Sequence, residues 1–172
     1  DESDRMLTLR QAAADMEKII ARLEEASRRN QYPQADVAPS IFAALKGQLR
    51  MPHNGKVIVP FGLSTDPITR LKSYSPGIVI KGKAGASVRL VASGTVAYTG
   101  NLRGYGNFVI IRHDSRHYTT YAGLGRVNVS EGQHLAGGSS LGTSGDNGEV
   151  RFELRAGREA LDPVEWIKFE AL

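Results

Sequence analysis

The hydrophobic positions near the start of the chain follow the repeat of a helix. From Leu9 the apolar residues recur at alternating spacings of three and four, which places them along one stripe of an α-helix. The stripe consists of Leu9, Ala12, Met16, Ile19, Leu23 and Ala26, widened by Ala13 and Ile20. We predict a helix over residues 4–29, within an N-terminal segment 1–30 that Asn30 and Pro33 bring to an end. Its apolar stripe needs a cover, which could be another helix, a second copy or a groove of the same chain.

The periodicity is lost after the helix. Residues 31–40 contain two prolines and no regular apolar spacing, so they are predicted to be a linker. Ser40 is placed to cap a short helix over residues 41–46, which Gly47 would end.

Short β-branched runs separated by glycine turns occupy the rest of the chain. They predict strands at residues 56–59, 78–80, 87–91, 95–98, 107–111 and 150–154. Residues 41–172 are therefore predicted to form a mainly β domain of antiparallel sheets, arranged as a sandwich or a partly open barrel.

Composition narrows the class of protein further. The 172 residues suffice for one ordinary domain with a short appendage, and no apolar run reaches the ~18 residues that would cross a bilayer. The absence of cysteine excludes disulfides, thiolate zinc sites and cysteine nucleophiles. The sequence begins at Asp1 without the pattern of a signal peptide, so we expect a processed or excised fragment.

The charge is concentrated in the β region. The net charge is +4, and residues 51–172 hold fourteen basic and ten acidic side chains, whereas residues 1–50 hold eight of each. This excess favours an anionic partner. Nucleic acid is not the expected partner, because the charge is accompanied neither by an Arg/Lys-rich helix nor by an RNP-like aromatic motif.

The histidines offer few candidates for metal chemistry. His113 and His117 have the i,i+4 spacing of a metal pair on a helix, but the segment between them is predicted as a hairpin turn, which favours a structural pair. His53 and His134 lie in a turn and a loop, and we predict surface positions for both.

Other catalytic patterns are weak. Glu149 and Glu153 share a face of one predicted strand, and exposed charge explains them better than the paired carboxylates of a glycosidase. The sequence has no nucleophile elbow, Walker loop or dinucleotide fingerprint.

An ordered set of landmarks over residues 41–166 resembles the LytM, or lysostaphin-type, metallopeptidase domain (peptidase family M23-like). The first part, similar to the EnvC-type murein hydrolase activators, comprises Phe42, Leu45-Lys46-Gly47, Leu49, Pro52, Gly55 and Phe61-Gly62. The pattern continues through Gly77-Ile78, Gly94-Thr95-Val96, Gly104-Tyr105-Gly106-Asn107, Tyr118, Tyr121-Ala122, Gly132-Gln133, Leu141-Gly142, Gly145, Phe152-Glu153-Leu154-Arg155 and Asp162-Pro163. The resemblance implies an antiparallel β-sheet domain with a groove.

The catalytic members of this family hold one zinc ion through His-x-Gly-x-Asp and His-x-His motifs, and a further His positions or activates the water. The resemblance places Ser75 and Val79 at the first two ligand positions, Gly123 at the His of Tyr-Ala-His, and Glu149-Val150-Arg151 at His-x-His. Val79 and Gly123 have no donor atom, and a guanidinium has no free lone pair for a metal. The sequence therefore predicts a degenerate domain without catalytic residues, metal or cofactor.

Such degenerate domains activate cell-wall amidases, so the resemblance implies an activator of an N-acetylmuramoyl-L-alanine amidase in cell division and daughter-cell separation. The predicted amidase-binding groove has a floor of Ser75, Val79, Tyr121, Gly123, Glu149 and Arg151, with Arg70 and Lys72 on its rim. A cleft of this kind suits an amphipathic segment of a partner. An interface elsewhere on the domain stays open.

The same resemblance gives the N-terminal helix a regulatory task. We predict that Leu9, Met16, Ile19, Ile20 and Leu23 cover the groove and autoinhibit it, while a plain continuation of a coiled coil stays open. The resemblance also implies a periplasmic location and a link through an upstream coiled coil to the FtsE–FtsX complex. The alternatives are a peptidoglycan-binding module or, less favoured, a zinc murein endopeptidase with unusual ligands.

Overall fold

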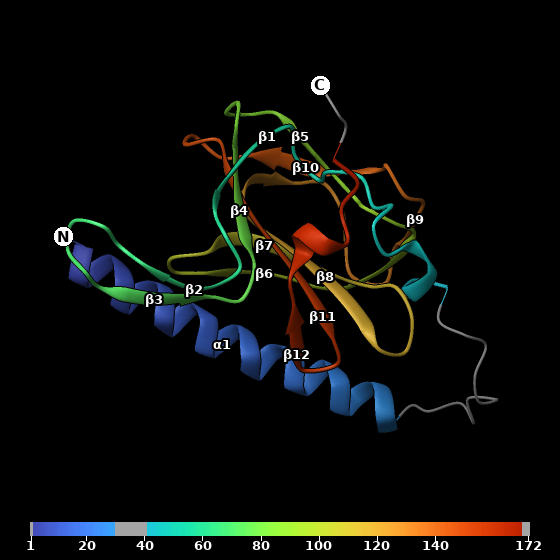
Figure 1. Ribbon diagram of the computed structural model, residues 1–172. Coiled ribbons are helices and arrows are strands. Elements are labelled where there is room, and N and C mark those ends of the chain that lie inside the picture. The colour runs from blue at the N-terminus through green and yellow to red at the C-terminus, as the bar shows by residue number, and fades with distance from the viewer. Residues whose placement is uncertain (1, 30–40, 170–172) are drawn as a thin grey trace.

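The computed structural model describes residues 2–29 and 41–169, and consists of one long helix lying against a β-domain (Figure 1). The helix α1 spans Glu2–Arg29, and Arg28 and Arg29 in its last turn complement the negative end of the helix dipole. The predicted linker, residues 31–40, lies outside the described residues. No helix in the described ranges is long and apolar enough to cross a membrane.

Within residues 41–169, the β-domain contains twelve strands. They are β1 (Gly55–Val59), β2 (Gly62–Thr65), β3 (Lys72–Ser75), β4 (Ile78–Gly82), β5 (Ser87–Arg89), β6 (Gly94–Leu102), β7 (Gly106–Arg112), β8 (His117–Val127), β9 (His134–Leu135), β10 (Ser140–Ser144), β11 (Glu149–Ala156) and β12 (Glu159–Leu161). All six predicted strands are present as β1, β4, β5, β6, β7 and β11. β8, the longest strand of the domain, was predicted only as the strand that follows the turn between His113 and His117, without its bounds.

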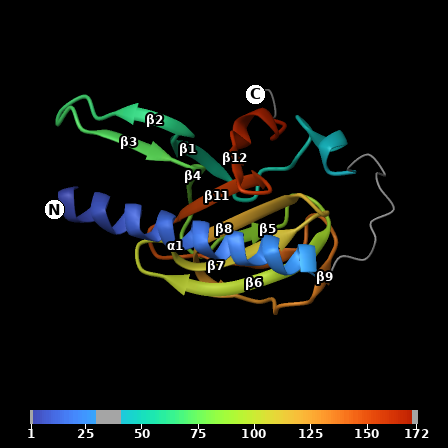
Figure 2. The same cartoon turned by 90° about the horizontal axis from the view of Figure 1, so that it is seen from below.

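The strands pair antiparallel, which confirms the predicted fold class. The main sheet has the order β1-β4-β11-β8-β7-β6-β9, with β12 beside β11 and β10 joining β5 to β8. β2 and β3 form a separate hairpin, which projects from the domain at the end where α1 begins (Figure 2). Strands β4, β11 and β8 are therefore neighbours at the centre of the sheet, although they lie far apart in the sequence.

The alternation along β11 separates two cores. Val150, Phe152 and Leu154 are fully buried in the larger core, which also holds residues from β4, β5, β7 and β10. Arg151 and Arg155 belong to the alternate positions, which face the other side of the sheet.

The second core lies between that other face and α1, which crosses strands β6, β7 and β8 (Figure 2). The fully covered helix residues are Ala12, Met16 and Ile20, and Leu9, Ala13, Ile19 and Leu23 pack at the margins. The sheet contributes Phe108, Ile110, Tyr118 and Ala122, together with Tyr105 from the β6–β7 turn. The apolar stripe of the helix is therefore covered by the same chain.

The segment before β1 differs from the predicted short helix. Only Ala43–Leu45 forms a single 3-10 turn, and its N-terminal position is occupied by Phe42 without a side-chain cap. Phe42 is buried instead between His113, at 4.5 Å between ring centroids, and Trp166, at 5.3 Å. The predicted cap, Ser40, lies outside the described residues, and the aromatic packing of Phe42 anchors this segment.

Burial of His113 makes the stability of the fold depend on pH. Burial lowers the pKa of His113 to about 4, although a hydrogen bond to the Ser93 carbonyl and the nearby Asp114 oppose the shift. The folded state keeps this ring neutral while the unfolded chain protonates it near pH 6.5. The contribution of the neutral His113 ring to the free energy of unfolding is therefore complete above pH ~6.5, and it is lost as the pH falls toward 4.

We expect the free energy of unfolding to fall by about 2 kcal/mol more between pH 7.5 and 5 in the unaltered chain than in His113→Gln. Urea titrations at the two pH values measure this difference. His134→Gln, at an exposed histidine, is the matched control and should keep the pH dependence of the unaltered chain. Equal pH dependence in all three proteins would contradict the assignment to His113.

Candidate functional site

The resemblance predicts a site from segments of β3, β4, β8 and β11, and the sheet brings these segments together. Arg151 on β11 lies opposite Val79 on β4 and opposite Ala122 on β8. Directly opposed residues of antiparallel strands point to the same side, so Arg151 and Val79 share the face on which α1 lies. Val79 itself is only 7% exposed.

Arg151 and Ser75 form a polar pair at this point. Nη1 of Arg151 donates to Oγ of Ser75 at 3.1 Å, and Ser75 donates in turn to the carbonyl of Gly77 at 2.7 Å. The guanidinium also lies over the ring of Tyr105, 4.8 Å from its centroid, in a cation–π arrangement. Tyr105 packs in the core beneath α1, so this pair adjoins the helix.

Gly123 lies at the end of the same site, where the backbone leaves no room for a side chain. Its φ is +84°, in the left-handed region that favours glycine. A Cβ added here would lie 2.6 Å from the carbonyl oxygen of Glu149. A histidine at this position would therefore require the backbone of β8 or β11 to move.

A buried ion network continues the site along the helix. Arg155 and Glu153 are 1% and 0% exposed and form a 3.1 Å pair, and Arg155 also donates to Glu17 of α1 at 2.7 Å. Burial alone would lower the pKa of Arg155, but Glu153 and Glu17 outweigh it and raise the pKa, which keeps the guanidinium charged. The ion pair thus fixes the position of α1 along β11.

Comparison with known proteins assigns the family. The sequence matches peptidase family M23 over residues 73–163, which is more than half of the chain. The chain belongs to peptidase family M23. The matched range begins just before Ser75 and includes Val79, Gly123 and Arg151.

The M23 chain has relatives among named cell-envelope proteins. It is 34% identical over 123 residues to the murein hydrolase activator NlpD of Escherichia coli, covering 69% of this chain and 31% of that protein. It is 31% identical over 140 residues to the lipoprotein NlpD/LppB homolog of Pseudomonas aeruginosa, covering 78% of this chain and 45% of that protein. The chain thus spans less than half the length of these curated relatives.

Two solved structures share the fold. A zinc-containing peptidase from Vibrio cholerae superposes with a TM-score of 0.61 at 20% identity, over 74% of this chain and 41% of that one. A chain from the SpoIIIAH–SpoIIQ complex gives 0.61 at 23% identity, over 70% of this chain and all of that one.

The side chains at the M23 ligand positions do not fit a zinc ion. The hydroxyl of Ser75 is engaged by Gly77 and Arg151, Val79 has no donor, and the guanidinium of Arg151 is a cation. A hydrolytic zinc site needs about three protein ligands and an open position for water. Within residues 2–29 and 41–169, moreover, no three His, Cys, Asp or Glu side chains are grouped so that they could hold a metal.

The structure differs from two predictions for residues on β8 and β11. Tyr121 does not line the floor, because it points into the opposite core, where its hydroxyl accepts from Val91 N–H and Thr119. Glu153 is not an exposed charge but a fully buried one. Glu149 does lie on the face of Arg151, and it is partly exposed at the end of β11.

The predicted rim residues lie on the β2–β3 hairpin. Lys72 is exposed and three residues from Ser75 along β3, which corresponds to a separation of ~10 Å. Arg70 lies farther out, in the hairpin turn, with φ of +62°. They belong to a projecting wall rather than to the immediate surroundings of Arg151.

The histidine predictions had mixed outcomes. His53 is not a surface residue, because it is 1% exposed and its Nε2 lies 2.9 Å from the carbonyl oxygen of Gly148. His113 and His117 are a structural pair that packs against Phe42: the His113 ring is stacked on it and the His117 ring is tilted to it, and His117 lies 3.0 Å from Asp114. His134 is exposed, as predicted.

Three members of the site were not predicted from the sequence: Tyr105, Glu17 and Arg155. The available signal was the period of two along Glu149-Val150-Arg151-Phe152-Glu153-Leu154-Arg155, which puts four charged residues on one face of a strand. Such a face needs partners from outside the strand if it is buried.

Proposed function

We propose that this chain is a non-catalytic activator of a cell-wall N-acetylmuramoyl-L-alanine amidase, acting in cell division and daughter-cell separation. One observation supports this most directly: the ligand positions of the family meet in space, and an Arg151–Ser75 pair stands there instead of zinc donors. The scaffold that shapes the groove is retained while the chemistry is replaced. The relatives named as murein hydrolase activators support the same role.

The groove acts by binding. Arg151 supplies a planar cation held by Ser75 and Tyr105, and Glu149 adds an acceptor at the edge of the floor. The β2–β3 hairpin forms a side wall, with Leu63 80% exposed and Ile68 90% exposed. Apolar side chains on a wall beside a charged floor suit an amphipathic segment of the amidase.

Helix α1 restrains this activity. Its buried stripe lies on the same face of the sheet as Arg151, and Glu17 ties it to Arg155. An amidase segment that needs this face must displace the helix. A docked helix worth ~3 kcal/mol lowers the apparent affinity for the amidase by ~100-fold.

The proposed role includes a periplasmic location and a link to the FtsE–FtsX complex. The lipoprotein names of the relatives support a periplasmic location. The heptad-like stripe of α1 is consistent with an upstream coiled coil, through which the FtsE–FtsX complex would pull the helix from the groove.

Release of dye from labelled peptidoglycan tests the activator role. We expect no release by the chain alone, slow release by a purified amidase, and faster release by the mixture. In a second assay, the chain alone is treated with EDTA, dialysed into zinc-free buffer and then mixed with zinc-loaded amidase. The treated chain should stimulate the amidase as strongly as the untreated chain does.

Two results would overturn the proposal. Release of dye by the chain alone would support the zinc endopeptidase hypothesis instead, especially if the purified protein contained stoichiometric metal. A mixture no faster than the amidase alone, tested across the amidases of the source organism, would leave the chain as a wall-binding module.

A further inference from the structure

The β2–β3 hairpin gathers exposed apolar side chains at the end of the domain where α1 begins (Figure 2). Nine large apolar side chains are exposed in residues 2–29 and 41–169, and four of them lie within this one hairpin: Leu63, Ile68, Leu71 and Tyr74. Ile68 is 90% exposed and Leu63 is 80% exposed. Clustered apolar side chains on a projecting element mark a surface that contacts a partner or a membrane.

The two faces of the hairpin differ in polarity. Leu63 lies directly opposite Tyr74, so these two side chains share one face. Ser64 lies opposite Ser73 on the other face, where the two Oγ atoms are 3.4 Å apart. The ring of Phe61 packs edge-on against Tyr74, with 6.1 Å between the ring centroids, and supports the apolar face at its base. The hairpin is therefore amphipathic.

The turn that joins β2 to β3 satisfies its own backbone. Ile68 and Thr69 donate their N–H groups to Oδ1 of Asp66, both at 2.8 Å. Arg70 donates to the carbonyl of Asp66 and Asp66 to the carbonyl of Leu71, both at 2.9 Å, and Leu71 donates to the hydroxyl of Thr69 at 3.3 Å. Every backbone N–H of residues 66–71 is thus bonded within the turn. Lipid offers few replacement partners for an N–H group, so a turn closed in this way is suited to a lipid surface.

Charged side chains border the apolar ones. Arg70 and Lys72 are exposed in the turn and in β3, and Asp66 is the one acid within residues 62–75. Lys72 and Tyr74 are two residues apart in β3 and lie on the same face. Basic side chains beside apolar ones are attracted to anionic lipid headgroups, and tyrosine favours the boundary between water and lipid. The three charges limit insertion to the headgroup level.

We propose that the tip of the β2–β3 hairpin binds the surface of a bilayer that contains anionic phospholipid. Leu63, Ile68 and Leu71 enter the boundary between headgroups and acyl chains, while Arg70 and Lys72 bind the lipid phosphates. The turn offers no free N–H for a partner protein to pair with, which favours a lipid surface over a protein as its occupant. The proposal does not depend on the activator role.

Flotation of the whole chain with lipid vesicles tests the proposal. Vesicles of phosphatidylglycerol mixed with phosphatidylcholine should bind the chain ~10-fold or more tightly than vesicles of phosphatidylcholine alone. Leu63→Ser combined with Ile68→Ser should weaken binding by ~10-fold or more, because both apolar side chains are lost. The matched control is Ile41→Ser combined with Val164→Ser, at two exposed apolar residues outside the hairpin, and it should bind as the unaltered chain does. Unfolding temperatures check that each variant is folded.

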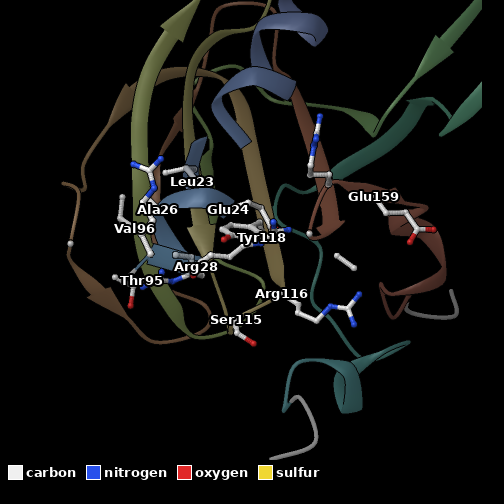
Figure 3. A pocket seen from close by; sticks show the side chains of 18 residues that line it. Leu23, Glu24, Ala26, Arg28, Thr95, Val96, Ser115, Arg116, Tyr118 and Glu159 are labelled. Carbon is white, nitrogen blue, oxygen red and sulfur yellow. The ribbon is translucent and has the colours of Figure 1, made fainter. Parts of the chain in front are cut away.

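The contribution of the cations has its own variant. Arg70→Gln combined with Lys72→Gln should remove most of the preference for phosphatidylglycerol. Its control is Arg28→Gln combined with Arg116→Gln, which changes the net charge equally. These two exposed arginines line the cleft beside the C-terminal end of α1, at the other end of the helix from the hairpin (Figure 3). The control should keep the full preference for phosphatidylglycerol.

A tryptophan at the tip measures contact with the lipid. The fluorescence of Ile68→Trp should be quenched by vesicles whose acyl chains are brominated, and that of Ile41→Trp should not. The native Trp166 is 7% exposed, and the unaltered chain gives its background signal.

Leu63 and Ile68 also border the proposed amidase groove, and the assays separate the two uses because the vesicles contain no amidase. Failure to bind any vesicle, unchanged binding by the Leu63 and Ile68 variant, or equal quenching at positions 68 and 41 would each overturn the proposal. Unchanged vesicle binding by that variant, with amidase stimulation lost in a lipid-free assay, would assign the tip to the amidase instead. Absence of amidase stimulation by the unaltered chain would overturn the activator role and leave the vesicle measurements unaffected.

Discussion

Replacing Met16 and Ile20 together by aspartate is expected to raise the apparent affinity of the chain for its amidase by ~100-fold. Both side chains are 0% exposed in the core between α1 and the sheet. Each contributes ~1.5–3 kcal/mol by burial, and an unpaired carboxylate in the same place is costly as well. The variant helix should leave the sheet, and the population open to the amidase should rise accordingly.

The effect should be specific to the covered face of α1. Leu7→Asp combined with Ala14→Asp introduces the same two charges at exposed positions of the same helix and should leave the affinity unchanged. Ile19→Asp combined with Leu23→Asp, at the half-buried margins, should give a smaller increase. Binding of purified amidase by interferometry measures all three. Unchanged affinity in the Met16 and Ile20 variant, with α1 shown by limited proteolysis to be released, would contradict autoinhibition.

Arg151→Glu, made in the released-helix background, is expected to lower amidase stimulation at least tenfold. Arg151 is the cation among the residues at the family's ligand positions, hydrogen-bonded to Ser75 and lying over Tyr105. Reversal of its charge removes a charge-assisted contact worth ~1.5–3 kcal/mol and places a carboxylate against the partner. The released background separates this loss from any effect on helix docking.

Arg126→Glu is the control for this charge reversal, since Arg126 is an exposed arginine of β8 outside the groove. The Arg126→Glu variant should stimulate the amidase as strongly as the released-helix protein with Arg126 unaltered. If Arg151→Glu retains full stimulation and an unchanged unfolding temperature, the amidase interface lies elsewhere on the domain.

The helix and the sheet core were predictable because their signals are local. The spacing of Leu9, Met16 and Leu23 defines a stripe, and a stripe of that length needs a cover in water. The resemblance then related Ser75, Val79 and Arg151 to one site. The pairing of β4 with β11 brings Val79 opposite Arg151, and a hydrogen bond joins Arg151 to Ser75 on β3.

The errors arose where burial depends on distant segments. His53 lies in a local turn, yet it is buried against Gly148, ninety-five residues away. Glu153 has the sequence signature of an exposed charge, and only Arg155 together with the covering helix makes its burial tolerable. Local pattern cannot supply either contact.

Strand β8 shows a different limit. Its central run, Tyr118-Thr119-Thr120-Tyr121, has hydroxyls on both faces and therefore lacks the apolar alternation of a half-buried strand. Tyr121 faces the larger core, whereas Tyr118 and Ala122 face α1. Successive side chains of a strand point to opposite faces, so the face of Tyr121 depends on the register of β8. The sequence did not give that register.

The central claim is that the amidase and α1 compete for one face of the sheet, and amide hydrogen exchange across α1 tests it most directly. The measurement compares the intact chain alone with the same chain saturated by amidase. The account predicts that the amides around Met16 and Ile20 are protected in the free chain and exchange much faster in the complex, because a displaced helix loses the packing that stabilises it. Protection as strong in the fully activating complex as in the free chain would contradict it.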